Sequence, residues 1–164
     1  MWHLVFISVH AVFAVAAFVA GLAMLLAPPG PRSWGRPSPL IHATGVTVMS
    51  ATLPFSLAVG WSDVGAAARP VFIGLFALSL YMVWRALQAG HAWRRSDRGR
   101  LIDHVGFNLI ALATGFLAVV VLRAGAGVVG ILAVAIGVPI LGHWAIHRLK
   151  ARAARSASLA PVEQ

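Results

Sequence analysis

Five apolar runs dominate the sequence, and each is close to the length of about 20 residues that an α-helix needs to cross a bilayer. Of the 164 residues, 60% are hydrophobic and only 10% are charged, whereas soluble domains carry about 25% charged residues. A soluble fold of this size could not bury so much apolar surface. We therefore predict an all-α integral membrane bundle of five transmembrane helices, forming one domain over residues 1–150. The spans are expected near residues 4–27, 40–61, 70–87, 101–122 and 128–146.

The loops between these runs carry most of the charge and predict an orientation. All but two of the thirteen Lys and Arg residues, the exceptions being Arg69 and Arg123, fall on the side opposite the N-terminus. By the positive-inside rule that side is cytoplasmic, so the N-terminus is outside and the C-terminus inside. The expected location is the bacterial inner (cytoplasmic) membrane. The basic rim on the cytoplasmic side comprises Arg94, Arg95, Arg98, Arg100, Arg148 and Lys150.

The formal charge of +9 follows this loop pattern, so it indicates membrane orientation and not nucleic-acid binding. Residues 151–164 form a basic and then polar cytoplasmic tail, which we expect to lie along anionic headgroups or to be disordered. Trp93 and Trp144 fit an aromatic belt at the inner interface.

Several kinds of chemistry are excluded or weakened by what the sequence lacks. With no cysteine there is no disulfide, thiolate metal site or thiol catalysis. No phosphate-binding loop, dinucleotide-binding motif, zinc-protease motif or nucleophile elbow occurs. No acidic residue lies within an expected span, although proton pumps and cation-coupled carriers usually need one.

Polar and small residues fall on shared stripes when each span is drawn as a helix at about 100° per residue. Small residues let membrane helices approach closely, and polar ones avoid lipid. We therefore expect these stripes to face the bundle interior. Their members are His10, Ala14, Ala17 and Gly21 in the first span, His42, Gly45, Met49, Ser56 and Gly60 in the second, Gly74, Tyr81, Arg85 and Gln88 in the third, and His104, Asn108, Ala111 and Gly115 in the fourth.

Histidines are the first candidates for a site. His42 and His104 lie at one depth near the cytoplasmic ends of their spans, where Asp103 or Asn108 could orient a ring. Neutral imidazole is a common ligand of haem iron, copper and zinc, so one hypothesis is a haem b or metal site. His143 and His147, at i and i+4, form a separate candidate metal clip. The competing interpretation is that these histidines are structural or interfacial, because polar residues collect at the ends of membrane helices.

Arg85, with Tyr81 on its stripe, forms the second candidate with Asp103 and Asn108. An ion pair between Arg85 and Asp103 would tie the third and fourth spans together. The structural interpretation is a lock on topology, and the functional one is a quinone or anion site.

The first two spans resemble a family of small bacterial polytopic membrane proteins of unknown function. The similar segments are HAVFAVAAFVAGLAMLLAPPGP from His10 and IHATGVTVMSATLP from Ile41. In that family a His opens the first span, Pro and Gly close it, and a basic loop leads into a Met-containing second span. The later YMVWRAL segment is similar to the family's aromatic-Gly-Trp-Arg-Ala pattern, with Val83 in place of the Gly. The resemblance covers roughly the first hundred residues, and it implies a helical membrane bundle and no reaction.

Three functional hypotheses remain open. The first is a non-catalytic accessory or assembly subunit of a larger respiratory or photosynthetic membrane complex, with other membrane subunits and anionic lipid as partners. The second is a b-type haem or metal-binding electron-transfer protein, and the third is a small transporter.

Overall fold

The computed structural model describes residues 2–26, 38–60 and 69–158. Over these residues the chain forms five helices and no strand, as the sequence predicts. Their bounds are α1 Trp2–Leu26, α2 Ser38–Gly60, α3 Arg69–Arg94, α4 Arg98–Arg123 and α5 Gly127–Ser158.

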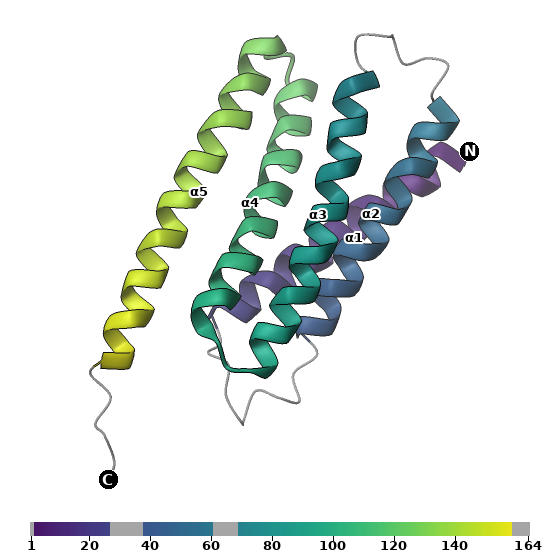
Figure 1. Cartoon of the computed structure of the whole chain (residues 1–164). Coiled ribbons are helices and arrows are strands. Elements are labelled where there is room, and N and C mark those ends of the chain that lie inside the picture. The colour runs from purple at the N-terminus through teal and green to yellow at the C-terminus, as the bar shows by residue number, and fades with distance from the viewer. Residues whose placement is uncertain (1, 27–37, 61–68, 159–164) are drawn as a thin grey trace.

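Four of the helices form a closed ring and the fifth lies outside it. Over the described residues α1 packs on α2 and α4, and α3 also packs on α2 and α4. By contrast α5 packs on α4 alone, and Figure 1 shows it at the edge of the molecule. The core of this protein therefore lies among α1–α4, and most of the surface of α5 is left to its surroundings.

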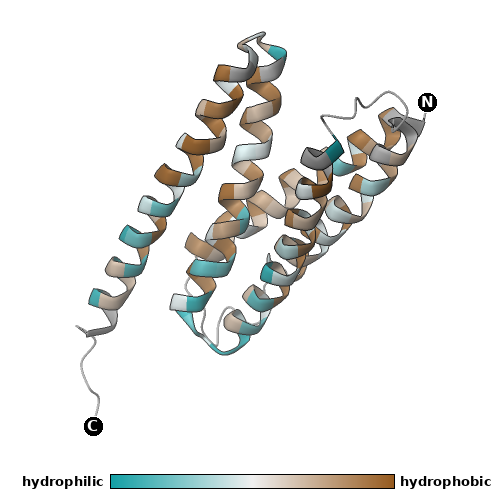
Figure 2. Ribbon diagram, turned by 45° about the horizontal axis from the view of Figure 1, so that its top comes forward, coloured by the Kyte–Doolittle hydropathy of each residue, from teal (hydrophilic) through white to brown (hydrophobic). Residues whose placement is uncertain are grey.

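Four helices are long and apolar enough to cross a membrane, and their candidate spans are Leu4–Leu26, Ile73–Arg94, Arg98–Val121 and Val129–Arg155. The remaining helix, α2, has 23 residues, and it packs on α1 and α3 within the ring. In Figure 2 much of the helical ribbon has the colour of hydrophobic residues. The chain therefore has the makeup of a polytopic membrane protein.

Two helices run further than predicted. The third span was expected to end at residue 87, but α3 continues to Arg94, and α5 continues past residue 146 to Ser158. The first eight residues of the predicted tail are thus helical. The added segments are rich in Ala and Arg, which are strong helix formers, and contain no proline.

The α3–α4 turn has the hydrogen bonds of a Schellman motif. Asp97 N–H donates to Ala92 O (3.0 Å) and Ser96 N–H to Trp93 O (3.1 Å), with Ser96 in the left-handed region at a φ of 55°. Asp97 then caps α4, because its Oδ1 accepts from Arg100 N–H at 3.0 Å. The turn closes within three residues, so α3 and α4 are antiparallel neighbours.

The interior stripe predicted for α3 is wrong by about one residue. Tyr81 is 43% exposed and Gly74 is also exposed, whereas Met82 and Ala86 are buried. Among the side chains of α3 that the structure describes, the buried ones are Ser79, Met82, Ala86, Ala89, Ala92 and Trp93. Small side chains allow close helix approach, so long Tyr and Arg side chains lie beside this face instead.

The expected interior stripes of the other helices hold at their centres. Ala17 and Gly21 of α1 are buried, as are His42 and Gly45 of α2. A Cβ on Gly45 would lie 2.9 Å from Phe13 O of α1, so α1 and α2 cross at very short range. In α4, Asn108 is fully buried and Gly115 is exposed. Ser56 and Gly60 lie outside the residues whose side chains the structure describes.

Trp93 is a second correction, because it is only 3% exposed and belongs to the core cluster around Met24, Leu101 and Val105. It is therefore not part of an interfacial belt. Trp144 of α5, by contrast, is exposed.

Reciprocal glycine sockets join α5 to α4. Ile146 lies over Gly106, where an added Cβ would come within 2.5 Å of it, and Ile110 lies over Gly142 at 2.4 Å by the same measure. Each helix thus inserts an isoleucine into a gap on its neighbour. This register also brings Lys150 of α5 opposite Asp103 of α4.

Candidate functional site

A buried polar node joins all four helices of the ring. The His42 ring of α2 is fully buried, and its Nδ1 lies 2.8 Å from the carbonyl oxygen of Ala17 in α1. Its Nε2 lies 3.2 Å from Nδ2 of Asn108 in α4, and that amide nitrogen also donates to Met82 O of α3 at 3.2 Å. The node therefore connects α1, α2, α3 and α4 through two side chains.

The partners determine the protonation of the ring. A carbonyl oxygen only accepts, so Nδ1 of His42 carries the proton and donates it to Ala17 O. In the neutral imidazole Nε2 is then an acceptor, which matches the Asn108 amide donor. The His42 ring packs directly against Gly21 because this residue has no side chain. A Cβ on Gly21 would lie only 3.1 Å from His42 Nδ1. Asn108, which the sequence offered as a residue that could orient a ring, is hydrogen-bonded to His42.

This arrangement does not fit a haem held between His42 and His104. Iron ligation needs a free lone pair, and the only one on the His42 ring is directed at Asn108. The His104 ring is partly buried and packs edge-on against Trp84, with ring centroids 6.1 Å apart. Within the described ranges no hydrogen bond or ring contact joins His42 to His104, although Nδ1 of His104 is buried without a partner.

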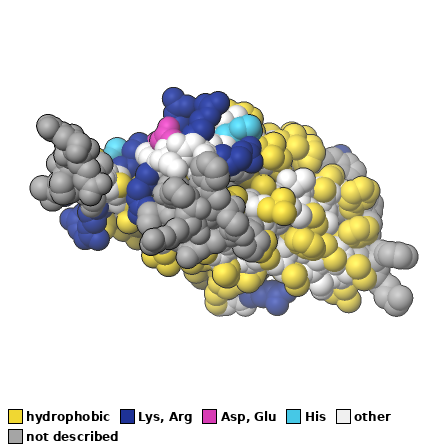
Figure 3. Space-filling view, turned by 90° about the horizontal axis from the view of Figure 1, so that it is seen from below, with side chains coloured by type: hydrophobic (Ala, Val, Ile, Leu, Met, Phe, Trp, Pro, Cys, Tyr) yellow, Lys and Arg dark blue, Asp and Glu magenta, His cyan; other side chains and the backbone are white. Residues whose placement is uncertain are grey.

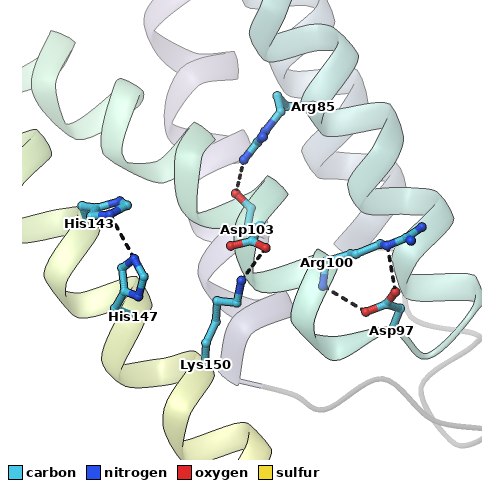
Figure 4. Close-up of polar contacts among 7 residues, drawn as sticks. All are labelled: Arg85, Asp97, Arg100, Asp103, His143, His147 and Lys150. Atoms are coloured by element: carbon cyan, nitrogen blue, oxygen red, sulfur yellow. Dashed lines mark hydrogen bonds and ion pairs between the residues drawn. The ribbon is translucent and has the colours of Figure 1, made fainter.

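The expected ion pair between Arg85 and Asp103 is replaced by a relay of three residues (Figure 4). Arg85 Nη2 donates to the main-chain carbonyl of Asp103, and the Asp103 carboxylate instead accepts from Lys150 Nζ at 2.7 Å. Asp103 thus contacts both α3 and α5. Arg85 links α3 to α4 through a main-chain carbonyl, and the Asp103 carboxylate pairs with a residue 47 positions away in α5.

Aromatic rings surround the Arg85 guanidinium. Its Cζ lies 4.9 Å from the ring centroid of Phe107 and 5.7 Å from that of Tyr81, whose hydroxyl accepts from Nη1 at 3.4 Å. Tyr81 also stacks on Trp84. The predicted interior position of Tyr81 is therefore wrong, since it covers the flank of the α3–α4 contact and shields the arginine. Such contacts stabilise a cation at the edge of a membrane bundle.

His143 and His147, the candidate metal clip on α5, form a close pair. Nε2 of His143 and Nε2 of His147 are 3.0 Å apart, and both rings are exposed. Figure 4 shows the two rings next to one another on α5, in an edge-to-face arrangement. A group of three or more His, Asp or Glu side chains able to hold a metal ion does not occur within residues 2–26, 38–60 and 69–158.

The predicted basic rim gathers at one end of the molecule, which we call the basic end. It consists of the α3–α4 turn and the C-terminal part of α5, and in Figure 3 several clusters of Lys and Arg lie on this face. Its residues are exposed or partly exposed, and comprise Arg94, Arg95, Arg98, Arg100, Arg148, Lys150, Arg152 and Arg155. Arg100 pairs with Asp97 at 3.3 Å. Arg69 and Arg123 lie at the opposite ends of α3 and α4.

Sequence reasoning missed the acceptors of the node and the sockets under α5. Main-chain carbonyls such as Ala17 O carry no side-chain signal. Gly106 and Gly142 could have been noticed, because isolated glycines inside membrane helices often mark close contacts.

Comparison of the chain with family models, with curated proteins and with solved structures finds no match in any of the three. The functional argument therefore rests on the residues and contacts above.

Proposed function

We propose that this protein is a non-catalytic integral membrane protein that serves as an accessory or assembly subunit of a larger bacterial inner-membrane complex. The observation that carries the proposal is the use of the buried polar side chains. His42 and Asn108, two of the buried polar side chains of the ring, form hydrogen bonds to neighbouring helices. The chemistry inside the ring is thus structural.

The position of α5 supports a role in assembly. This helix contacts α4 alone, yet the sockets at Gly106 and Gly142 and the ion pair to Asp103 hold it in one register. Its outer surface is apolar and exposed at Leu132, Ile136 and Ile140. A rigidly held helix with one neighbour offers a defined apolar surface to another transmembrane segment.

The proposed orientation places the basic end in the cytoplasm. It is supported by the gathering of Lys and Arg at that end of the described helices, because cationic loops are retained on the cytoplasmic side during insertion.

Purification from native membranes in a mild detergent tests the proposal. Tagged full-length protein is expected to elute with a stoichiometric set of larger subunits. The pair Ile136→Trp and Ile140→Trp keeps α5 apolar but changes its surface, so it should release those subunits. Val15→Trp and Val19→Trp make the same change on the exposed side of α1 and serve as the control.

Elution of the wild-type protein alone from several mild detergents would contradict the proposal, as would equal loss of subunits in both variant pairs. The visible absorption spectrum of the same preparation tests the haem hypothesis. A Soret band that shifts on reduction and disappears in His42→Ala would replace the assembly role by electron transfer.

A further inference from the structure

One exposed stripe of α5 changes from apolar to basic at Trp144. On its N-terminal side Ile136 and Ile140 are exposed, and Trp144 follows four residues later at 55% exposure. The stripe then continues with three arginines, which we call the arginine stripe: Arg148, Arg152 and Arg155. In Figure 2 the hydrophobic colour of α5 gives way to hydrophilic colour towards the C-terminus.

The arginine stripe faces away from the bundle. Ile146 and Lys150 contact α4, and Arg148 is two positions from each, about 200° around the helix. Arg148, Ala151, Arg152 and Arg155 line a half-open hollow of about 290 Å³ on this outer side. The arginine stripe is therefore accessible to a ligand from the membrane surface.

Two contacts hold guanidinium groups along the helix. The Cζ of Arg148 lies 3.8 Å from the ring centroid of Trp144, so the guanidinium covers the indole. Nε of Arg155 donates to Ala151 O at 3.4 Å, which turns this side chain back towards the hollow. Stacked or bonded arginines keep donors for further hydrogen bonds, since each guanidinium carries five N–H groups.

The depth of these residues matches the lipid headgroup layer. From Gly127 to Arg148 the helix rises about 31 Å at 1.5 Å per residue, close to the 30 Å or so of the hydrocarbon core. Arg152 and Arg155 lie about 6 and 10 Å further along the axis. Trp144 falls just inside this boundary, where membrane proteins place indole rings.

We propose that the hollow on the arginine stripe binds the phosphate headgroup of an anionic diacyl phospholipid. Guanidinium groups bind phosphate oxygens with paired hydrogen bonds. The acyl chains would extend from the level of Trp144 into the hydrocarbon layer. The inference is independent of the assembly role, because it concerns lipid at the end of α5 and not a protein on its apolar side.

The α3–α4 turn supplies a matched control. Arg94, Arg95 and Arg98 lie at the same end of the molecule and carry the same charge as the arginine stripe. Among the described residues they do not line the hollow. If general charge attraction holds the lipid, neutralising either set of three arginines should lower lipid retention equally. If a headgroup site holds it, only neutralising the arginine stripe should lower retention.

Native mass spectrometry of the full-length protein, released from nanodiscs of phosphatidylcholine with one fifth phosphatidylglycerol, tests the proposal. The wild-type protein should retain phosphatidylglycerol above its share of the bilayer. The variant Arg148→Gln, Arg152→Gln, Arg155→Gln should lose at least about tenfold in retention, since the loss of one hydrogen bond to a charged group lowers binding by about that factor. The control variant Arg94→Gln, Arg95→Gln, Arg98→Gln should keep most of it. Trp144→Ala should reduce retention by a smaller factor.

Three results would overturn the proposal. Equal losses in the two triple variants would show general charge attraction without a site. Displacement of the lipid by sodium phosphate at matched ionic strength would show a site for free phosphate. A triple stripe variant that keeps its lipid but loses a co-purifying protein would show that the arginine stripe docks a protein.

Discussion

Replacement of Asn108 by leucine should destabilise the bundle by about 1 kcal/mol. The substitution keeps a similar volume but removes two hydrogen bonds between helices, from Nδ2 to His42 Nε2 and to Met82 O, both at 3.2 Å. Hydrogen bonds between membrane helices contribute about 0.6 kcal/mol each on average, with a maximum near 1.7 kcal/mol. The expected loss of stability is somewhat smaller than the sum of two such bonds. Oδ1 of Asn108 is buried without a hydrogen-bond partner, so removing this oxygen breaks no bond.

The coupling between His42 and Asn108 is the sharper test. In Asn108→Leu alone, Nε2 of His42 remains buried with no donor, which costs free energy of its own. His42→Leu with Asn108→Leu removes both partners of that bond. The double variant should therefore cost about 0.6–1.7 kcal/mol less than the sum of the single variants.

Reversible unfolding in mixed micelles, followed by tryptophan fluorescence to which the buried Trp93 contributes, measures these free energies. Asn108→Ala cannot overpack the core, so a similar loss excludes a steric cause. Thr47→Val is the matched control, because its hydroxyl donates to Ala43 O within the same helix at an exposed position. If the single costs add to within about 0.3 kcal/mol of the double, the node does not couple the helices and the reasoning is wrong.

The remaining predictions concern α5 and orientation. Gly142→Leu should weaken docking of α5 on α4 by about 1–3 kcal/mol, because a Cβ there would lie 2.4 Å from a side chain of α4. The control Gly137→Leu should be tolerated, because a Cβ at Gly137 would have nothing within 4 Å. Hydrogen exchange of the α5 amides distinguishes the two variants. Zinc should bind the His143 and His147 pair, since nitrogens 3.0 Å apart can share an ion at about 2.0–2.1 Å from each. Titration calorimetry should detect zinc binding in the wild-type protein and none in His147→Ala. Equal binding in both proteins would refute the metal clip. Ser96→Cys, in a chain without cysteine, should resist an impermeant maleimide on intact spheroplasts; labelling before lysis would reverse the proposed orientation.

Much of the fold could be predicted from hydropathy. The five apolar runs became five helices, and the polar residues His42 and Asn108 were expected inside the bundle, where the structure places them. These features depend on segment length and composition, which are properties of the chain read locally. The same local reasoning ended α5 too early, because hydropathy falls at the membrane surface while helix propensity continues to Ser158.

The details of the candidate site depended on which helices meet. A helical wheel placed Tyr81 inside, but packing selected the adjacent face with Met82 and Ala86, since small side chains allow closer approach. The partner of Asp103 also differed, because α5 docks on α4 and brings Lys150 within 2.7 Å.

The sequence alone thus determined that the chain has helices apolar and long enough to cross a membrane, how many helices there are, and at which end positive charge gathers. Each of these properties follows from residues close together in the chain. The tertiary structure decided that α5 stands outside a ring of four and that both nitrogens of His42 are already bonded. Those facts depend on contacts between residues up to 66 positions apart, and such contacts are determined by the shapes of the helix surfaces and not by hydropathy.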